Sequence, residues 1–215
     1  MKHARTFLKF LGITLAMLMV LGGLTAFFFP ALLEIPFILY MNNREITLFE
    51  VRGEELYMNG EINSKTYDQF TQIMAENPQI RTLVEEVVPG SLDDYTMIKL
   101  AYFVREQGLN TKLLAHSAID SGGVDLFLAG VERTMERGAH IGVHSWSDGL
   151  KEAADYARDA PEHEQNRKYI EDMLGRDDFY WFTIYAAPAD GIYEMTEAEI
   201  IEYGLLTEPV QTSSN

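Results

Sequence analysis

The chain has no cysteine among its 215 residues. This absence excludes disulfide bonds, cysteine nucleophiles, iron–sulfur clusters and zinc sites built on thiolates. Positive charge is scarce as well, because 17 lysines and arginines stand against 33 aspartates and glutamates, for a net charge of -16. Since phosphate binding needs clustered lysine and arginine, nucleic acid is excluded as the main partner. Apolar residues make up 47% of the chain, which is enough for a sizeable core.

Residues 10–29 form one apolar run of 20 residues without a charge. That length matches a helix that crosses a hydrocarbon core of about 30 Å. Three basic residues precede the run, Lys2, Arg5 and Lys9. No acidic residue occurs before Glu34. Because basic flanks stay in the cytoplasm, we expect a cytoplasmic flank over residues 1–9, a transmembrane signal anchor over residues 10–29, and the remainder across the membrane.

Two other interpretations of this run remain open. A cleaved secretory signal has a similar order of basic and apolar residues, although this run is long and no clean A-x-A cleavage pattern follows it. The run is also compatible with a buried helix of a soluble protein. Pro30 and Pro36 interrupt helical structure, so residues 30–43 are expected to form an apolar linker.

Residues 44–208 have the length of a single domain, and residues 209–215 form a polar tail. Apolar periodicity and turn residues predict alternating elements in this domain. The expected strands cover residues 46–51, 55–58, 81–88, 112–118 and 139–144, and the expected helices cover 64–75, 91–107, 122–129, 149–185 and 195–203. Such alternation predicts an α/β fold with a mostly parallel sheet.

Two tight junctions carry candidate site residues. Pro89-Gly90-Ser91 ends a strand, and Ser91 is expected to cap the following helix, with Asp94 in the capping-box position. The N–H groups of this turn suit an anion or an oxyanion, although the same sequence also fits an ordinary turn. Ser121, followed by Gly122 and another glycine, begins the next helix. This position suits a nucleophile, and it equally suits a serine that only caps the helix.

A pair of histidines ends the following strand. His140 and His144 are four residues apart and therefore lie on one face of a strand. They could ligate zinc only with a third ligand from elsewhere, and no H-E-x-x-H pattern is present. His144 as a single general base for Ser121 is the alternative. His116 and His163 carry no supporting pattern and are interpreted as structural or solvated.

Taken in order, these stretches resemble the ClpP/crotonase superfamily, and most closely the periplasmic ClpP-like serine hydrolases with an N-terminal membrane segment. The similar stretches are the turn at 89–91, the helix at 121–130 with its Leu-Ala-Gly ending, the strand at 139–145 and the Met-Thr…Gly-Leu ending at 195–205. The resemblance implies a ClpP/crotonase-like spiral of ββα units, preceded by one transmembrane helix in a bacterial inner membrane. It also implies a homo-oligomer, no cofactor, and a periplasmic or other extracytoplasmic domain.

Carried over to this chain, the resemblance makes Ser121 the nucleophile and His144 the base. The N–H groups of Ser91 and Gly122 would form the oxyanion hole. The family's third triad member, an aspartate, would fall near Ile192, so Asp190 is the candidate here. The implied activity is that of a membrane-anchored peptidase acting on peptides or unfolded proteins.

This sequence also departs from the family pattern. Ser91 replaces the second glycine of the turn, and Asp120 and Asp125 flank the expected nucleophile where small or apolar residues are usual. Asp125 could orient a group or could oppose a further negative charge. The alternative to a hydrolase is therefore an inactive ClpP-like module that binds peptides or proteins at the membrane. A crotonase-type acyl-thioester enzyme is a third candidate.

Overall fold

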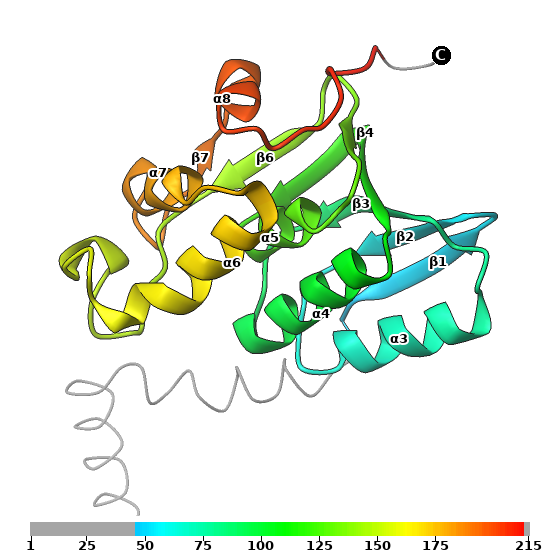
Figure 1. Cartoon of the computed structure of the whole chain (residues 1–215), viewed down its shortest axis with the longest axis horizontal. Helices are drawn as coiled ribbons and strands as arrows, with labels where there is room; N and C mark the ends of the chain where they lie inside the picture. Colours follow the sequence, from blue (N-terminus) through cyan, green and yellow to red (C-terminus); the bar gives the residue numbers. More distant parts are fainter. Residues whose placement is uncertain (1–45, 213–215) are drawn as a thin grey trace, which may run out of the picture. The chain divides into compact units, whose positions relative to one another are not determined.

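A seven-stranded mixed sheet runs through the part of the chain that the computed structural model describes, residues 46–212 (Figure 1). These residues belong to a compact unit, residues 42–215. The predicted flank, anchor and linker over residues 1–43 lie outside the described residues. Within residues 46–212, no helix is long and apolar enough to cross a membrane.

The strands follow the order β1-β2-β3-β4-β6-β7, and β5 pairs separately with β4. Their bounds are β1 Leu48–Arg52, β2 Glu55–Asn59, β3 Thr82–Val88, β4 Asn110–Asp120, β5 Arg133–Met135, β6 His140–Val143 and β7 Tyr193–Glu194. The pairs β2–β3, β3–β4, β4–β5 and β4–β6 are parallel, whereas the two outermost pairs are antiparallel. The predicted α/β class with a mostly parallel sheet is therefore confirmed.

Helices connect the strands and pack side by side along the sheet, α3 on α4, α4 on α5, α5 on α6 and α6 on α7 (Figure 1). Their bounds are α3 Thr66–Glu76, α4 Asp94–Glu106, α5 Gly122–Leu128, α6 Glu164–Leu174, α7 Asp178–Ala186 and α8 Glu197–Glu202. The expected cap of the last helix is confirmed, since Thr196 and Glu199 form a complete capping box.

Helix α4 begins two residues later than the sequence predicts. Its N-cap is Asp93, whose carboxylate accepts hydrogen bonds from the Thr96 N–H at 3.2 Å and the Thr96 hydroxyl at 2.8 Å. Ser91 instead forms an isolated parallel β-bridge with Ile62, and its hydroxyl accepts a hydrogen bond from the Asp93 N–H. The prediction that Ser91 caps this helix was therefore wrong, because Ser91 pairs with Ile62 instead.

The predicted helix over residues 149–185 is also wrong in its first part. Residues 147–163 form turns and two short 3₁₀ helices, Ala153–Asp155 and Pro161–His163. Asp148 accepts bonds from the N–H groups of Leu150 and Lys151, at 2.8 and 2.9 Å. Such side-chain bonds to the backbone compete with helix formation, so helix-forming residues here adopt a loop.

Strand β4 bends in its middle, and this bend directs its second half towards the candidate site. Residues Thr111 to Leu113 pair with β5, whereas Ala118 to Asp120 pair with β6 on the same edge. The hydroxyl of Ser117 supports the bend, since it donates to the Glu85 carbonyl and accepts from the Leu114 N–H. The strand therefore ends at Asp120, immediately before Ser121.

Glu85 is an acidic residue inside the core. It lies on β3, is fully buried, and its two carboxylate oxygens have no hydrogen-bond partner among the described residues. Burial raises the pKa of this carboxyl well above its usual range. The folded state therefore favours the protonated acid, whereas the unfolded chain ionises with a pKa of about 4.3.

We expect Glu85→Met to raise the melting temperature, and to raise it more at pH 8 than at pH 5. As pH rises above the unfolded pKa, the folded state must hold a proton that the unfolded state releases, so the native side chain destabilises the fold progressively. Thermal unfolding at both pH values measures this. Glu86→Met is the control, because Glu86 has partners in Asn59 and His116. An equal gain in both variants, or no gain from Glu85→Met at pH 8, would contradict the prediction.

Candidate active site

Ser121 has an unusual backbone conformation where β4 meets α5. Its φ is 51° and its ψ is -122°, and it is the only non-glycine residue with a positive φ in the described chain. Although it occupies the N-cap position of α5, its hydroxyl makes no capping hydrogen bond. Strained conformations of this kind cost about 1–3 kcal/mol and cluster at functional sites. The structure therefore does not support a capping role for the Ser121 hydroxyl.

The Pro-Gly-Ser turn packs directly against Ser121. Gly90 has a φ of +143°, and a Cβ added there would lie 3.4 Å from Ser121 Cβ and 3.9 Å from its Oγ. A Cβ added at Gly122 would lie 2.6 Å from Ser91 Cβ and 3.1 Å from Ser91 N. Within residues 46–212, neither the Ser91 nor the Gly122 N–H donates to a backbone acceptor. The two predicted oxyanion-hole donors are thus neighbours next to the candidate nucleophile.

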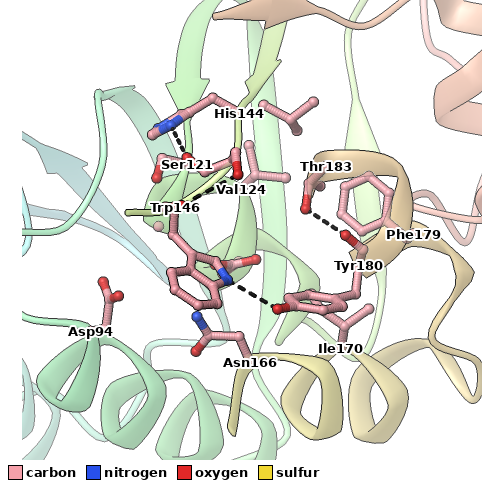
Figure 2. Close-up of a pocket in the computed structure, with 14 residues that line it drawn as sticks. Asp94, Ser121, Val124, His144, Trp146, Asn166, Ile170, Phe179, Tyr180 and Thr183 are labelled. Carbon is pink, nitrogen blue, oxygen red and sulfur yellow. Dashed lines mark hydrogen bonds between the residues drawn. The ribbon is translucent and has the colours of Figure 1, made fainter. Parts of the chain in front are cut away.

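His144 follows β6 and lines the same cavity as Ser121 and Gly122 (Figure 2). Its Nδ1 lies 2.7 Å from the carbonyl oxygen of Ser145. A neutral imidazole that donates from Nδ1 has Nε2 free to accept a proton. In the described part of the chain, no hydrogen bond joins the Ser121 hydroxyl to His144. The structure therefore brings the predicted pair into one cavity without a direct bond, which is a common arrangement in free enzymes.

Asp190 is not brought to this cavity. It is exposed in the turn between α7 and β7 and is absent from the residues that line the cavity. The register of β6 with β7 pairs Val143 with Tyr193, so Ile192 is the next residue opposite His144. Because Ile192 cannot hold an imidazole by a hydrogen bond, the Ser145 carbonyl is the group that contacts Nδ1 here.

Other carboxylates occupy the surroundings of His144 instead. Asp94 and Asp125 line the cavity, and His144 partly offsets the effect of burial on Asp94 and Asp120. Burial, together with the negative charge of Asp94, raises the pKa of Asp125 to about 7. The sequence identified Asp125 as one turn from the nucleophile, but gave Asp94 only a capping role.

The wall of the cavity comes from residues that sequence analysis missed. Trp146 lies in the loop after β6, and the others lie on α6 and α7: Asn166, Ile170, Phe179, Tyr180 and Thr183 (Figure 2). Trp146 Nε1 donates to the Tyr180 hydroxyl at 2.9 Å. The dense aromatic run of residues 179–182 was a signal of packing, but nothing in its spacing connected it to Ser121.

The remaining histidines have separate surroundings. His163 is fully buried among the rings of Trp146, Tyr156 and Trp181, and its Nδ1 lies 2.7 Å from the Tyr180 hydroxyl. It therefore supports the cavity wall. His140 is exposed and pairs with Glu194 at 2.8 Å. Across residues 46–212, no group of three or more His, Asp or Glu side chains could hold a metal ion.

Ser121→Gly is expected to stabilise the fold, whereas Ser121→Ala is not. Glycine adopts a positive φ without strain, so relief of about 1–3 kcal/mol exceeds the entropy that glycine adds to the unfolded chain, about 0.4–1 kcal/mol. For a domain of this size, a net gain of about 1 kcal/mol corresponds to a rise in melting temperature of about 2–4 °C. Alanine keeps the Cβ and the strain. Thermal unfolding of both variants measures this difference. Equal melting temperatures of Ser121→Gly and Ser121→Ala would show that the backbone of Ser121 is not strained.

Asp125→Asn is expected to raise the melting temperature at pH 8, with a gain that shrinks towards pH 5. The folded-state pKa of about 7 exceeds the unfolded value of about 3.9. The native carboxyl therefore destabilises the fold increasingly as pH rises between these two values. Thermal unfolding across this range measures the effect, with the exposed Asp68→Asn as control. A gain that is independent of pH would show that the charge of Asp125 is not its cause.

Two solved structures have this arrangement of elements, both of the membrane-bound stomatin-specific protease 1510-N. One is a lysine-to-alanine mutant in complex with a substrate peptide, at 20% identity and a TM-score of 0.50, covering 72% of this chain and 73% of that one. The other is a serine-to-alanine mutant, at 18% identity and a TM-score of 0.51, covering 72% of this chain and 77% of that one.

No known protein-family profile matches the chain, and no curated protein matches it. At 18–20% identity, the likeness to the two protease structures shows the fold. The chain therefore has a ClpP-like fold, as the resemblance of its sequence motifs implied.

Proposed function

We propose that this chain is a ClpP-like serine hydrolase that cleaves peptides, with Ser121 as nucleophile and His144 as general base. One observation carries the proposal: the strained backbone of Ser121, whose hydroxyl is free of any capping bond and adjoins the Pro-Gly-Ser turn. The fold shared with two protease structures, one holding a substrate peptide, supports this function.

The chemistry follows from the positions of three groups. A serine hydroxyl is a weak nucleophile until a base accepts its proton, and His144 Nε2 is the base available in the cavity. Attack of Oγ on a peptide carbonyl makes a C–O bond and places negative charge on the carbonyl oxygen. The N–H groups of Ser91 and Gly122 would stabilise that charge. The imidazolium then gives its proton to the leaving amine, and water repeats the sequence to release the acyl group.

The orientation of His144 differs from the usual triad. The Ser145 carbonyl accepts from Nδ1 and fixes the tautomer in which Nε2 is unprotonated. A carbonyl does not carry the full charge of a carboxylate, so it stabilises the imidazolium less well. We therefore expect slow acylation in comparison with a Ser-His-Asp enzyme, and Asp190 remains the residue to test as a distant third member.

We also propose that the enzyme is anchored in the bacterial inner membrane by residues 10–29, with its domain outside the cytoplasm. The support is the uncharged run with basic residues before it. Self-association into a homo-oligomer follows from the family resemblance alone. Size-exclusion chromatography with light scattering on the full chain tests it.

The second candidate function is an inactive ClpP-like module that binds peptides. Two observations favour it, namely the missing bond between Ser121 and His144 and the position of Asp190 outside the cavity. A negatively charged Asp125 would also oppose an oxyanion nearby. Only a direct test of nucleophilicity separates the two candidates.

A fluorophosphonate probe provides this test, because it labels only an activated serine. We expect the full chain to be labelled, Ser121→Ala to lose labelling completely, and His144→Ala to lose at least about a hundredfold in rate, the range of general-base contributions. Ser147→Ala, which removes an exposed serine, is the control and should keep the labelling rate. Absence of labelling in a folded wild-type sample would favour the binding module. A tenfold lower rate in Asp190→Ala would assign Asp190 to the site.

A further inference from the structure

We infer that the cavity beside Ser121 receives a positively charged side chain of the substrate, and that Asp125 is its counter-ion. The inference rests on the proposed peptidase function and names the substrate class of that site. It is carried by the position of Asp125, by the absence of a neutralising partner for it among the described residues, and by the aromatic side chains that line the same cavity.

The position of Asp125 is fixed relative to the reacting atoms. The residue lies on α5, four residues after Ser121, and both line the cavity. Its N–H donates to the Ser121 carbonyl at 3.1 Å, so one helical turn joins the two residues. A substrate carbonyl attacked by Ser121 would therefore have its own side chain within reach of the Asp125 carboxyl.

The Asp125 carboxyl has no partner in the part of the chain that the structure describes. Among the described residues, no hydrogen bond or ion pair engages its oxygens, and the nearby charge that acts on it is the like charge of Asp94. None of the residues that line the cavity is a lysine or an arginine. A half-buried carboxylate without a counter-ion is unfavourable, and the raised pKa of Asp125 expresses that cost. A cation brought by the substrate would remove it.

The half-buried Arg105 and the buried Arg133 cannot supply that cation. Arg105 donates to the carbonyls of Ala129 and Leu128, both at 2.8 Å. Arg133 donates to the carbonyls of Leu205 and Gly130. Because both guanidinium groups hold backbone carbonyls, the negative charge at the cavity is left for a ligand.

The aromatic side chains of the cavity suit a cation as well. The rings of Trp146 and Tyr180 line it and are held together by the bond from Trp146 Nε1 to the Tyr180 hydroxyl (Figure 2). His163 in turn holds the same hydroxyl from the core. Indole and phenol rings attract ammonium and guanidinium groups, so these rings would add to the attraction that Asp125 and Asp94 exert on the charged head of a lysine or arginine.

A binding experiment tests this without requiring catalysis. The full chain carrying Ser121→Ala is titrated with acetyl-arginine amide and with acetyl-citrulline amide, which has nearly the same shape but no charge. Isothermal calorimetry reports binding. We expect arginine to bind at least tenfold more tightly than citrulline. In Ser121→Ala/Asp125→Asn the ratio should fall to about one, whereas in Ser121→Ala/Asp68→Asn, which removes the same charge from α3, it should be unchanged.

Each outcome has a distinct meaning. Equal binding of the two amides, or a preference for arginine that survives Asp125→Asn, overturns the inference. If Asp125→Asn does not fold, Asp94→Asn takes its place, since Asp94 is exposed, and a two- to threefold fall in the ratio is then expected. An unchanged ratio would overturn the inference. Charge-dependent binding without fluorophosphonate labelling of the wild type would reject the peptidase function and support the cation-binding subsite. Labelling without a preference for the charged amide would support the peptidase function and reject the subsite.

Discussion

The candidate site depends on one close contact, the approach of the start of α5 to the end of β3. A Cβ added at Gly123 would lie 2.4 Å from the carbonyl oxygen of Val88, and one added at Gly122 would lie 2.6 Å from Ser91 Cβ. Only glycine permits backbones to come this close. The contact turns the chain sharply after β4, and this turn gives Ser121 its positive φ. It also places the Ser91 and Gly122 N–H groups side by side. The proposed nucleophile and the proposed oxyanion donors therefore share one structural cause.

The negative charge of the carboxylates near this contact opposes the formation of a negatively charged oxyanion. An oxyanion needs donors and gains nothing from a neighbouring carboxylate, yet Asp94 and Asp125 line the same cavity. Protonation of Asp125 would remove the conflict at low pH, and a substrate cation would remove it at higher pH. The second solution couples binding to chemistry, because only a substrate that neutralises the carboxylate makes the cavity suitable for a further negative charge. The acidic residues then act as a filter on substrates.

The sequence predicted those parts of the structure that depend on local signals. Alternating strands and helices followed from periodicity, and the passage from a strand to a helix at Ser121 was also predicted. The helix start at Asp93 was missed because serine and aspartate are both good caps, and only the bridge from Ser91 to Ile62 decides between them. β5 and β7, of three and two residues, are too short to show a period.

The cavity wall could not be predicted, because it depends on contacts between residues far apart in the chain. Tyr180 is held at the site by hydrogen bonds to Trp146 and His163. The positions of these two residues in the sequence do not indicate that they contact Tyr180. The absence of a carboxylate hydrogen-bonded to His144 was within reach of the sequence, since Ile192 stands where the family has its aspartate. What replaces it, the adjacent Ser145 carbonyl, is a backbone atom and leaves no trace in the sequence.

The conformation of Ser121 bears on the choice between a hydrolase and a binding module. A module that only binds peptides has no need of a hydroxyl at this point, and glycine would satisfy the same φ without strain. Serine here costs about 1–3 kcal/mol, and its hydroxyl gives nothing back to the fold, because it neither caps α5 nor bonds elsewhere in the described chain. For a domain whose total stability is of the order of 5–15 kcal/mol, that is a substantial cost. Nucleophilic attack is the role in which a side-chain oxygen at this point, and at no other, is required. The strain therefore favours the hydrolase.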